Sequence, residues 1–193
     1  EMGLVEGGAI TDEEPLTITA SPLLAETGLA NASLRAARRA FQGREIVISP
    51  RADPLAPVGT GEARIALVPA DAFFDLSGPE PARNERYEAV AAVGQMVVHL
   101  LSRSAMEDIT TIVTGPPGTA SHRLGPVLAA GLGLDAEIAA AESETAEAML
   151  AALESSGAQA VLVVAPSGHE TIAGLVDGAG LTLRPLEGWK EQA

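Results

Sequence analysis

The feature that most constrains this chain is a regular alternation of short aliphatic runs with segments of helical periodicity. Runs of about four to eight β-branched and aliphatic residues indicate strands that are covered on both faces, as in parallel sheets with helical crossovers. We predict strands at residues 16–21, 44–50, 63–69, 110–115, 136–142, 158–166 and 181–186, and helices at residues 31–41, 119–132, 144–156 and 169–177.

Three stretches are less regular. Residues 87–103 are long, apolar and rich in Val, and Gly94 interrupts them, so we predict two consecutive strand segments there. Residues 51–62 are rich in Pro and Gly and are predicted to be a loop. A short helical stretch is expected at residues 71–76.

The two series of strands and helices predict an α/β protein with two lobes of largely parallel sheet flanked by helices. The first lobe is placed at residues 16–103 and the second at residues 104–187. Residues 1–15 are predicted to be a disordered leader, and residues 188–193 a tail. We expect a ligand-binding cleft between the lobes.

The turn that follows the predicted strand at residues 110–115 has the sequence TGPPGTAS at residues 114–121. It resembles the start of a nucleotide-binding P-loop. A P-loop needs Lys to reach the terminal phosphates and a hydroxyl to bind magnesium. The aligned positions are Ala120, Ser121 and His122, which supply neither group in its place. The sequence therefore argues against nucleotide hydrolysis.

What remains is a Gly-rich turn that opens a helix, where free backbone N–H groups and the positive end of the helix dipole favour an anion. We predict that Gly115, Gly118, Thr119 and Ser121 bind a small carboxylate. The alternative is an ordinary strand-to-helix turn with Thr119 as the N-cap.

Other candidate ligand-binding residues follow from the rule that ligands of α/β sheets bind beyond the carboxyl ends of the strands. By that rule Ser21 and Asp71 belong to the first lobe. Ser167 and Gly168 form a second helix-start turn in the second lobe, in which Ser167 could equally be an N-cap.

Charge and composition exclude several classes of function. The net charge of −14 and the scarcity of aromatic residues argue against nucleic acid as a partner. There is no Cys, and the three His residues lack ligand spacing, so we predict no metal site and no cofactor. The absence of a G-x-S-x-G motif leaves hydrolysis unsupported, and we expect no enzyme activity.

Several charged and titratable residues have plain structural explanations. His99 is predicted to be a core or hinge histidine, and His122 and His169 are expected near helix starts. Arg35, Arg38 and Arg39 are predicted to form a solvated helix face. A solubilising acidic face is predicted from Glu137, Glu142, Glu144, Glu147 and Glu154.

The order and spacing of these segments resemble the TAXI-type solute-binding proteins of TRAP transporters, which are two-lobed periplasmic binding proteins. The motif VTGPPGTASHRLGPVLAAGLGL is similar to the family's Gly-rich turn and the helix that follows it. MVVHLLSR and EARIALVPADAFFD are similar to two of its strands, and the likeness runs from about Leu16 to Leu186.

The resemblance implies a periplasmic or extracytoplasmic protein that holds a small organic anion, such as an amino acid or another carboxylate, for a membrane permease. The full-length protein could be membrane-anchored. Two departures, the segment SPLLAETG in place of a Gly-rich loop and Pro69-Ala70 in place of a polar pair, favour an alternative. In that alternative, the module is degenerate and acts as a sensor or protein-interaction domain of an anchored protein.

Overall fold

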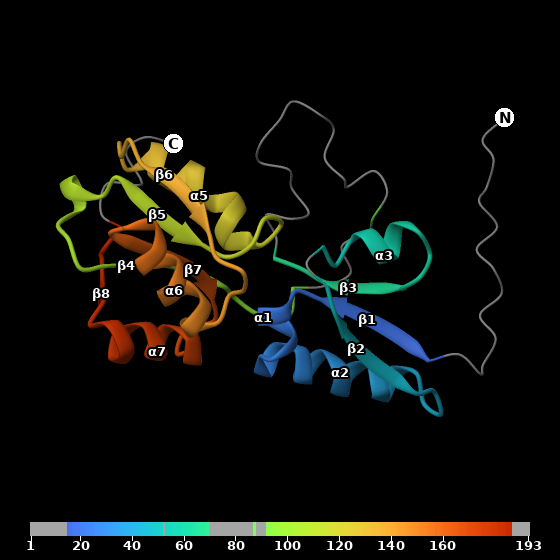
Figure 1. Cartoon of the computed structure of the whole chain (residues 1–193). Coiled ribbons are helices and arrows are strands. Elements are labelled where there is room, and N and C mark those ends of the chain that lie inside the picture. Colours follow the sequence, from blue (N-terminus) through green and yellow to red (C-terminus); the bar gives the residue numbers. More distant parts are fainter. Residues whose placement is uncertain (1–14, 52, 70–86, 88–91, 187–193) are drawn as a thin grey trace, which may run out of the picture.

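The computed structural model describes residues 15–51, 53–69, 87 and 92–186. These residues form a three-stranded sheet of order β2-β1-β3 and a five-stranded sheet of order β6-β5-β7-β4-β8, each flanked by helices (Figure 1). The predicted α/β class with two sheet units is therefore confirmed. Residues 1–14 and 187–193, which include nearly all of the predicted leader and tail, lie outside the described residues.

The first sheet is parallel throughout. β1 (Leu16–Ala20) pairs with β2 (Ile46–Pro50) on one side and with β3 (Ile65–Leu67) on the other. Helix α2 (Gly28–Ala40) covers one face of this sheet (Figure 1). It begins where the Thr27 side chain accepts a hydrogen bond from the Ala30 backbone N–H, and its residue Ala37 packs against the apolar strand residues.

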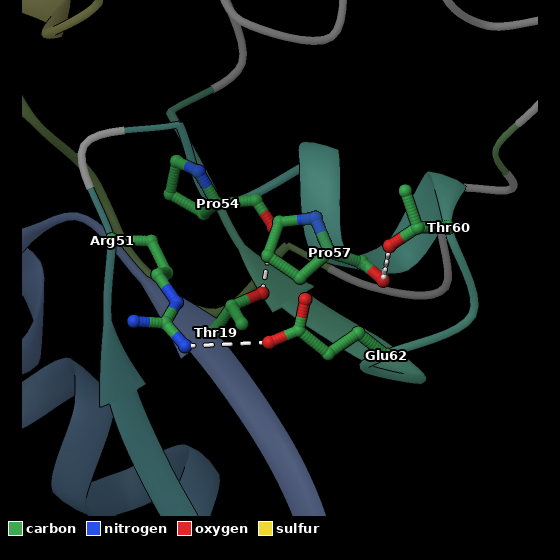
Figure 2. Close-up of polar contacts among 6 residues, drawn as sticks. All are labelled: Thr19, Arg51, Pro54, Pro57, Thr60 and Glu62. Carbon is green, nitrogen blue, oxygen red and sulfur yellow. Dashed lines mark hydrogen bonds and ion pairs between the residues drawn. The ribbon is translucent and has the colours of Figure 1, made fainter.

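Two short helices were not predicted from the sequence, and one of them lies in the predicted loop at residues 51–62. They are α1 (Pro22–Ala25) and α3 (Ala56–Gly59), and each has Pro in its first turn, a position where the missing N–H costs nothing. Figure 2 shows how the α3 segment is fastened: the Thr19 hydroxyl donates to the Pro54 carbonyl at 2.6 Å, and Arg51 pairs with Glu62 at 3.4 Å. Thr19 and Pro54 are 35 positions apart in the sequence, so local composition could not reveal their contact.

Four of the five strands of the second sheet run in one direction, and one strand is reversed. β5 (Thr111–Thr114) is parallel to β6 (Glu137–Ala140) and to β7 (Ala160–Ala165). β4 (Val97–Ser102) is antiparallel to β7 and to the two-residue strand β8 (Thr182–Leu183). A short 3-10 turn, η2 (Met106–Asp108), connects β4 to β5.

Helices cover both faces of this sheet. α5 (Ala120–Gly131) packs over Leu100, Ile112 and Leu162. α6 (Ala146–Ser156) and α7 (Glu170–Ala179) pack over the opposite face. All six residues of β7 are buried, and each fully buried Leu or Val stabilises the fold by about 1.5–3 kcal/mol.

The structure corrects two predictions about residues 87–103. Only Val97–Ser102 forms a strand, and residues 92–96 have no regular structure, while residues 88–91 lie outside the described residues. At Gly94 the Leu29 side chain of α2 occupies the space of a Cβ, so the chain passes close to α2 there instead of extending a sheet. β4 also belongs to the second sheet, so the division between the sheets precedes residue 97 and not residue 104.

The two sheet units share apolar contacts. Leu23 of α1 belongs to the core cluster formed by Leu101, Val163, Met149 and other residues of the second unit. α1 lies between the two sheets in Figure 1. The α1 segment therefore connects the first sheet to the core of the second.

Gly174 provides a test of the packing between α6 and α7. A Cβ built at Gly174 would lie 2.7 Å from the Cβ of Ala146, whereas at Gly178 the nearest atom, Leu150 Cδ1, is 3.4 Å away. Because helices can separate only by moving apart as units, Gly174→Ala should lower the free energy of unfolding by about 1–3 kcal/mol. Urea unfolding of the wild type and the variant measures this difference in the free energy of unfolding.

Gly178→Ala is the matched control on the same helix. It should leave stability unchanged or raise it by up to about 1 kcal/mol, since Ala has the higher helix propensity. Equal effects of the two substitutions would contradict the close approach of α6 and α7.

Candidate functional site

The candidate site lies at the carboxyl edge of the second sheet. β5 and β7 both end there, and the turns that follow them start α5 and α7. Because β4 is antiparallel to β7, its first residues lie at the same edge. The two predicted ligand-binding turns of this unit therefore occupy one edge of one sheet.

The first turn is built around Thr119, which is the N-cap of α5 as one of the sequence interpretations predicted. Its hydroxyl oxygen accepts a hydrogen bond from the His122 N–H at 3.4 Å and donates to the Pro116 carbonyl at 2.8 Å. Gly118 has a φ of 91°, a left-handed conformation that favours glycine, and it is exposed. His122 is held by a contact of 3.0 Å between its Nδ1 and the Thr114 hydroxyl.

Ser121 lies beneath this turn and is fully buried, whereas Thr119 is 4% exposed. The Ser121 hydroxyl accepts a hydrogen bond from the Gly115 N–H at 3.1 Å and donates to the Glu144 carboxylate at 2.6 Å. The Thr119 and Ser121 hydroxyls are 3.1 Å apart. These hydroxyls are thus engaged with a carboxylate of the chain itself.

Glu144 is the functional-site residue that the sequence analysis assigned to a solubilising face. Burial raises the pKa of its carboxyl, and hydrogen bonds from Ser121 and Thr119 and the charge of Arg123 oppose that increase. The side chain is therefore a partly buried acid at the start of α5. Sequence periodicity could not assign it there, because its partner Ser121 lies 23 positions earlier.

Gly115 makes room for this carboxylate. A Cβ at position 115 would lie 2.5 Å from Glu144 Cγ and 2.8 Å from Glu144 Oε1. Any larger residue would have to displace the Glu144 side chain. The glycine that resembles part of a phosphate loop is thus explained by an internal contact.

The second turn, before α7, is capped by His169 and not by Ser167. The Thr171 N–H donates to His169 Nδ1 at 3.3 Å, and the Thr171 hydroxyl donates to the Glu144 carbonyl at 3.1 Å. The two helix starts are therefore connected through Glu144. Ser167 and Gly168 are exposed, and Gly168 has a φ of 75°.

His99, near the beginning of β4, is a half-buried imidazole at the same edge. Burial lowers its pKa, hydrogen bonding to the Ala165 backbone opposes this, and the nearby His169 adds to the lowering. Its Nε2 atom is buried and has no hydrogen-bond partner among the described residues. The histidine that we predicted to be a core or hinge residue therefore has one ring nitrogen without a hydrogen-bond partner among the described residues.

The first-lobe candidates are arranged differently. Ser21 is the N-cap of α1, is 8% exposed and accepts a hydrogen bond from the Leu24 N–H at 3.4 Å. Asp71 and the predicted helix at residues 71–76 lie outside the described residues. The structure therefore brings together Gly115, Gly118, Thr119, Ser121, Ser167 and Gly168, and it keeps Ser21 on the other sheet.

The described part of the chain contains neither a cluster of metal-ligating residues nor a candidate membrane-spanning helix. No group of three or more His, Asp or Glu residues there could hold a metal ion. No helix in those ranges has the length and apolar character needed to cross a membrane.

Comparisons with known proteins identify the fold. No family model and no curated protein sequence matches the chain. YhfZ from Shigella flexneri matches with a TM-score of 0.54 and 14% identity, over 92% of this chain and 73% of its own. The alkanesulfonate-binding protein SsuA from Xanthomonas axonopodis pv. citri, bound to MOPS, matches with a TM-score of 0.53 and 18% identity, over 90% and 61%.

The cofactor-binding domain of the Cbl transcriptional regulator matches with a TM-score of 0.51 and 17% identity, over 92% of this chain and 78% of that domain. The chain therefore has a periplasmic-binding-protein-like fold. It spans about three fifths of the length of the SsuA structure.

Glu144→Gln should change how stability depends on pH. Since the pKa of Glu144 is raised above its ordinary value of 4.5, its contribution is fully present below that value and is lost as pH rises through the raised pKa. Gln cannot ionise and still accepts the Ser121 hydrogen bond. The variant should therefore gain stability relative to the wild type as pH increases, as urea unfolding at several pH values would measure.

Glu142→Gln is the control for this experiment, because it removes the same charge from an exposed position two residues earlier. Its stability relative to the wild type should not change with pH in this way. A similar pH dependence in both variants would show that overall charge, and not the buried carboxyl, is responsible.

The contact between Gly115 and Glu144 predicts that substitutions at these two positions have non-additive effects on stability. Gly115→Ala alone should lower the free energy of unfolding by about 1–3 kcal/mol, because the new methyl group displaces the carboxylate. Glu144→Ala in the same chain should recover part of that loss, with a coupling of about 0.5–3 kcal/mol in a double-mutant cycle. Additive effects would contradict the contact.

Proposed function

We propose that the chain is a non-catalytic binding module for a small organic anion, such as an amino acid or another carboxylate. The anion is held at the carboxyl edge of the second sheet, by the turns that start α5 and α7. The proposal continues the resemblance to TAXI-type solute-binding proteins. In that case the module is extracytoplasmic and delivers its ligand to a TRAP-type permease.

The observation that supports this proposal is the pairing of two helix starts at one sheet edge. Gly118, Ser167 and Gly168 are exposed, so an anion from solvent can reach these turns while Thr119 and Ser121 remain buried. Two neighbouring helix N-termini provide several N–H donors and favourable dipoles, and the Arg123 guanidinium, which donates to the Gly118 carbonyl, adds a positive charge at the α5 turn.

The structural neighbours support the same class of function. SsuA from Xanthomonas axonopodis pv. citri is described as an alkanesulfonate-binding protein, and Cbl contributes a cofactor-binding domain. Both descriptions concern small molecules, and the first concerns an anion. A carboxylate and a sulfonate present similar oxygen acceptors to backbone N–H groups.

A second candidate is a degenerate module that acts as a sensor or protein-interaction domain of a membrane-anchored protein. One observation favours it: the Glu144 carboxylate already accepts the Ser121 hydrogen bond at the start of α5. An internal anion there competes with an external one by like-charge repulsion.

A thermal-shift panel of amino acids, dicarboxylates and alkanesulfonates separates the two candidates. A ligand at about one hundred times its Kd should add about 2.7 kcal/mol to the stability of the folded state. A shift with at least one acid is expected for the binding module. No shift with any acid across the panel would refute it and favour the degenerate module.

The position of the site is tested by placing negative charge at both turns. Pro117→Glu combined with Ser167→Glu should abolish the ligand-induced shift, since both positions are exposed beside the helix starts. Ala151→Glu combined with Ser155→Glu adds the same charge at exposed positions on α6, away from both turns, and should preserve the shift. An undiminished shift in the first variant would place the ligand elsewhere.

A further inference from the structure

We infer that the outer face of α2 is a docking surface for an acidic helix of a partner protein. This surface is independent of the small-molecule site. It consists of Arg35, Arg38 and Arg39 with Ala32 and Ala36, all of which are exposed.

The two faces of α2 have opposite character. Ala30 and Ala37 are buried and Leu34 packs against the core of the first sheet. The opposite face carries Arg35 and Arg39, exposed Arg38 lies at the flank four positions after Leu34, and α2 contains no Asp or Glu. The helix thus presents only positive charge to solvent.

These charges are not neutralised within the described part of the chain. None of the three arginines has a salt bridge there. Arg38 and Arg39 lie in the last turn, where they interact favourably with the helix dipole, but Arg35 lies in the middle of the helix and has no such role.

The shape of the surface suits another helix. Ala32 and Ala36 are four positions apart and form a row of small side chains, and Arg35 and Arg39 form the adjacent row with the same spacing. Small residues let a second helix approach closely, and the arginines beside them can form bidentate pairs with carboxylates. Phe41, which follows the helix, is 40% exposed, and aromatic residues and Arg are enriched at interfaces.

The distribution of charge along the chain indicates an acidic protein partner. Residues 15–69 contain six basic and four acidic residues, whereas residues 92–186 contain three basic and ten acidic residues. An extended polyanion or an anionic membrane would also meet the acidic residues of the second unit, whereas a single acidic helix of the size of α2 would contact only the basic face. A symmetric contact between two copies of α2 would bring arginines together.

Fluorescence anisotropy with a labelled helical peptide of Glu-Ala-Ala-Ala repeats tests this surface, with a Gln-Ala-Ala-Ala peptide as the neutral reference. The wild type should bind the Glu peptide, and added salt should weaken the binding. Substitution of Arg35→Gln, Arg38→Gln and Arg39→Gln together should weaken it at least about tenfold. Because the three side chains are exposed, the variant should remain folded, and its thermal stability should fall only slightly as Arg38 and Arg39 lose their interaction with the helix dipole.

The matched control carries Ala151→Glu, Ser155→Glu and Ala173→Glu, which change the net charge equally at exposed positions of the second unit. It should bind the Glu peptide as the wild type does. Absence of binding by the wild type, or equal weakening in both variants, would overturn the inference.

Two further measurements with the same variants identify a different occupant. Size-exclusion chromatography with light scattering would reveal a dimer lost only in the arginine variant, and co-sedimentation with phosphatidylserine vesicles would reveal membrane binding lost only there. Either result would overturn the assignment to an acidic partner protein.

Discussion

The complete burial of β7 is the constraint on which the second unit depends. Its six residues are covered by α5 on one face and by α6 and α7 on the other, so no polar side chain fits along the strand. Polar groups are therefore restricted to the ends of the central strands. Gly115, Ser121, Glu144, Thr171 and His169 all lie at the carboxyl edge for that reason.

Local patterns in the sequence predicted most of the elements but not their contacts. The apolar run at Ala160–Ala165 and the Thr119 cap follow from composition and turn chemistry, so both were predictable. The direction of β4 was not, since apolar residues suit parallel and antiparallel pairing alike. The short helices α1 and α3 were missed because four residues are too few to show a helical period, and the segment around α3 is also rich in Pro.

The candidate site shows the same limit at the level of single residues. The glycines and hydroxyls of the α5 turn predicted an anion, and the structure provides one in the carboxylate of Glu144. Neither hydrophobic periodicity nor charge counting distinguishes this carboxylate from the exposed Glu142. Only the folded chain, with Gly115 leaving space and Thr171 holding the backbone, separates the two residues.

The internal carboxylate also constrains what the site can bind. An external anion at the start of α5 would lie near Glu144, and two like charges in a partly buried site raise each other's cost of ionisation. The start of α7 also carries an acid, Glu170, in its first turn, but that side chain is exposed to solvent, which screens its charge, and Ser167 and Gly168 are exposed there too. Under the proposed function, the α7 turn is therefore the better place for the negative charge of the ligand, and the α5 turn for its neutral or donor groups.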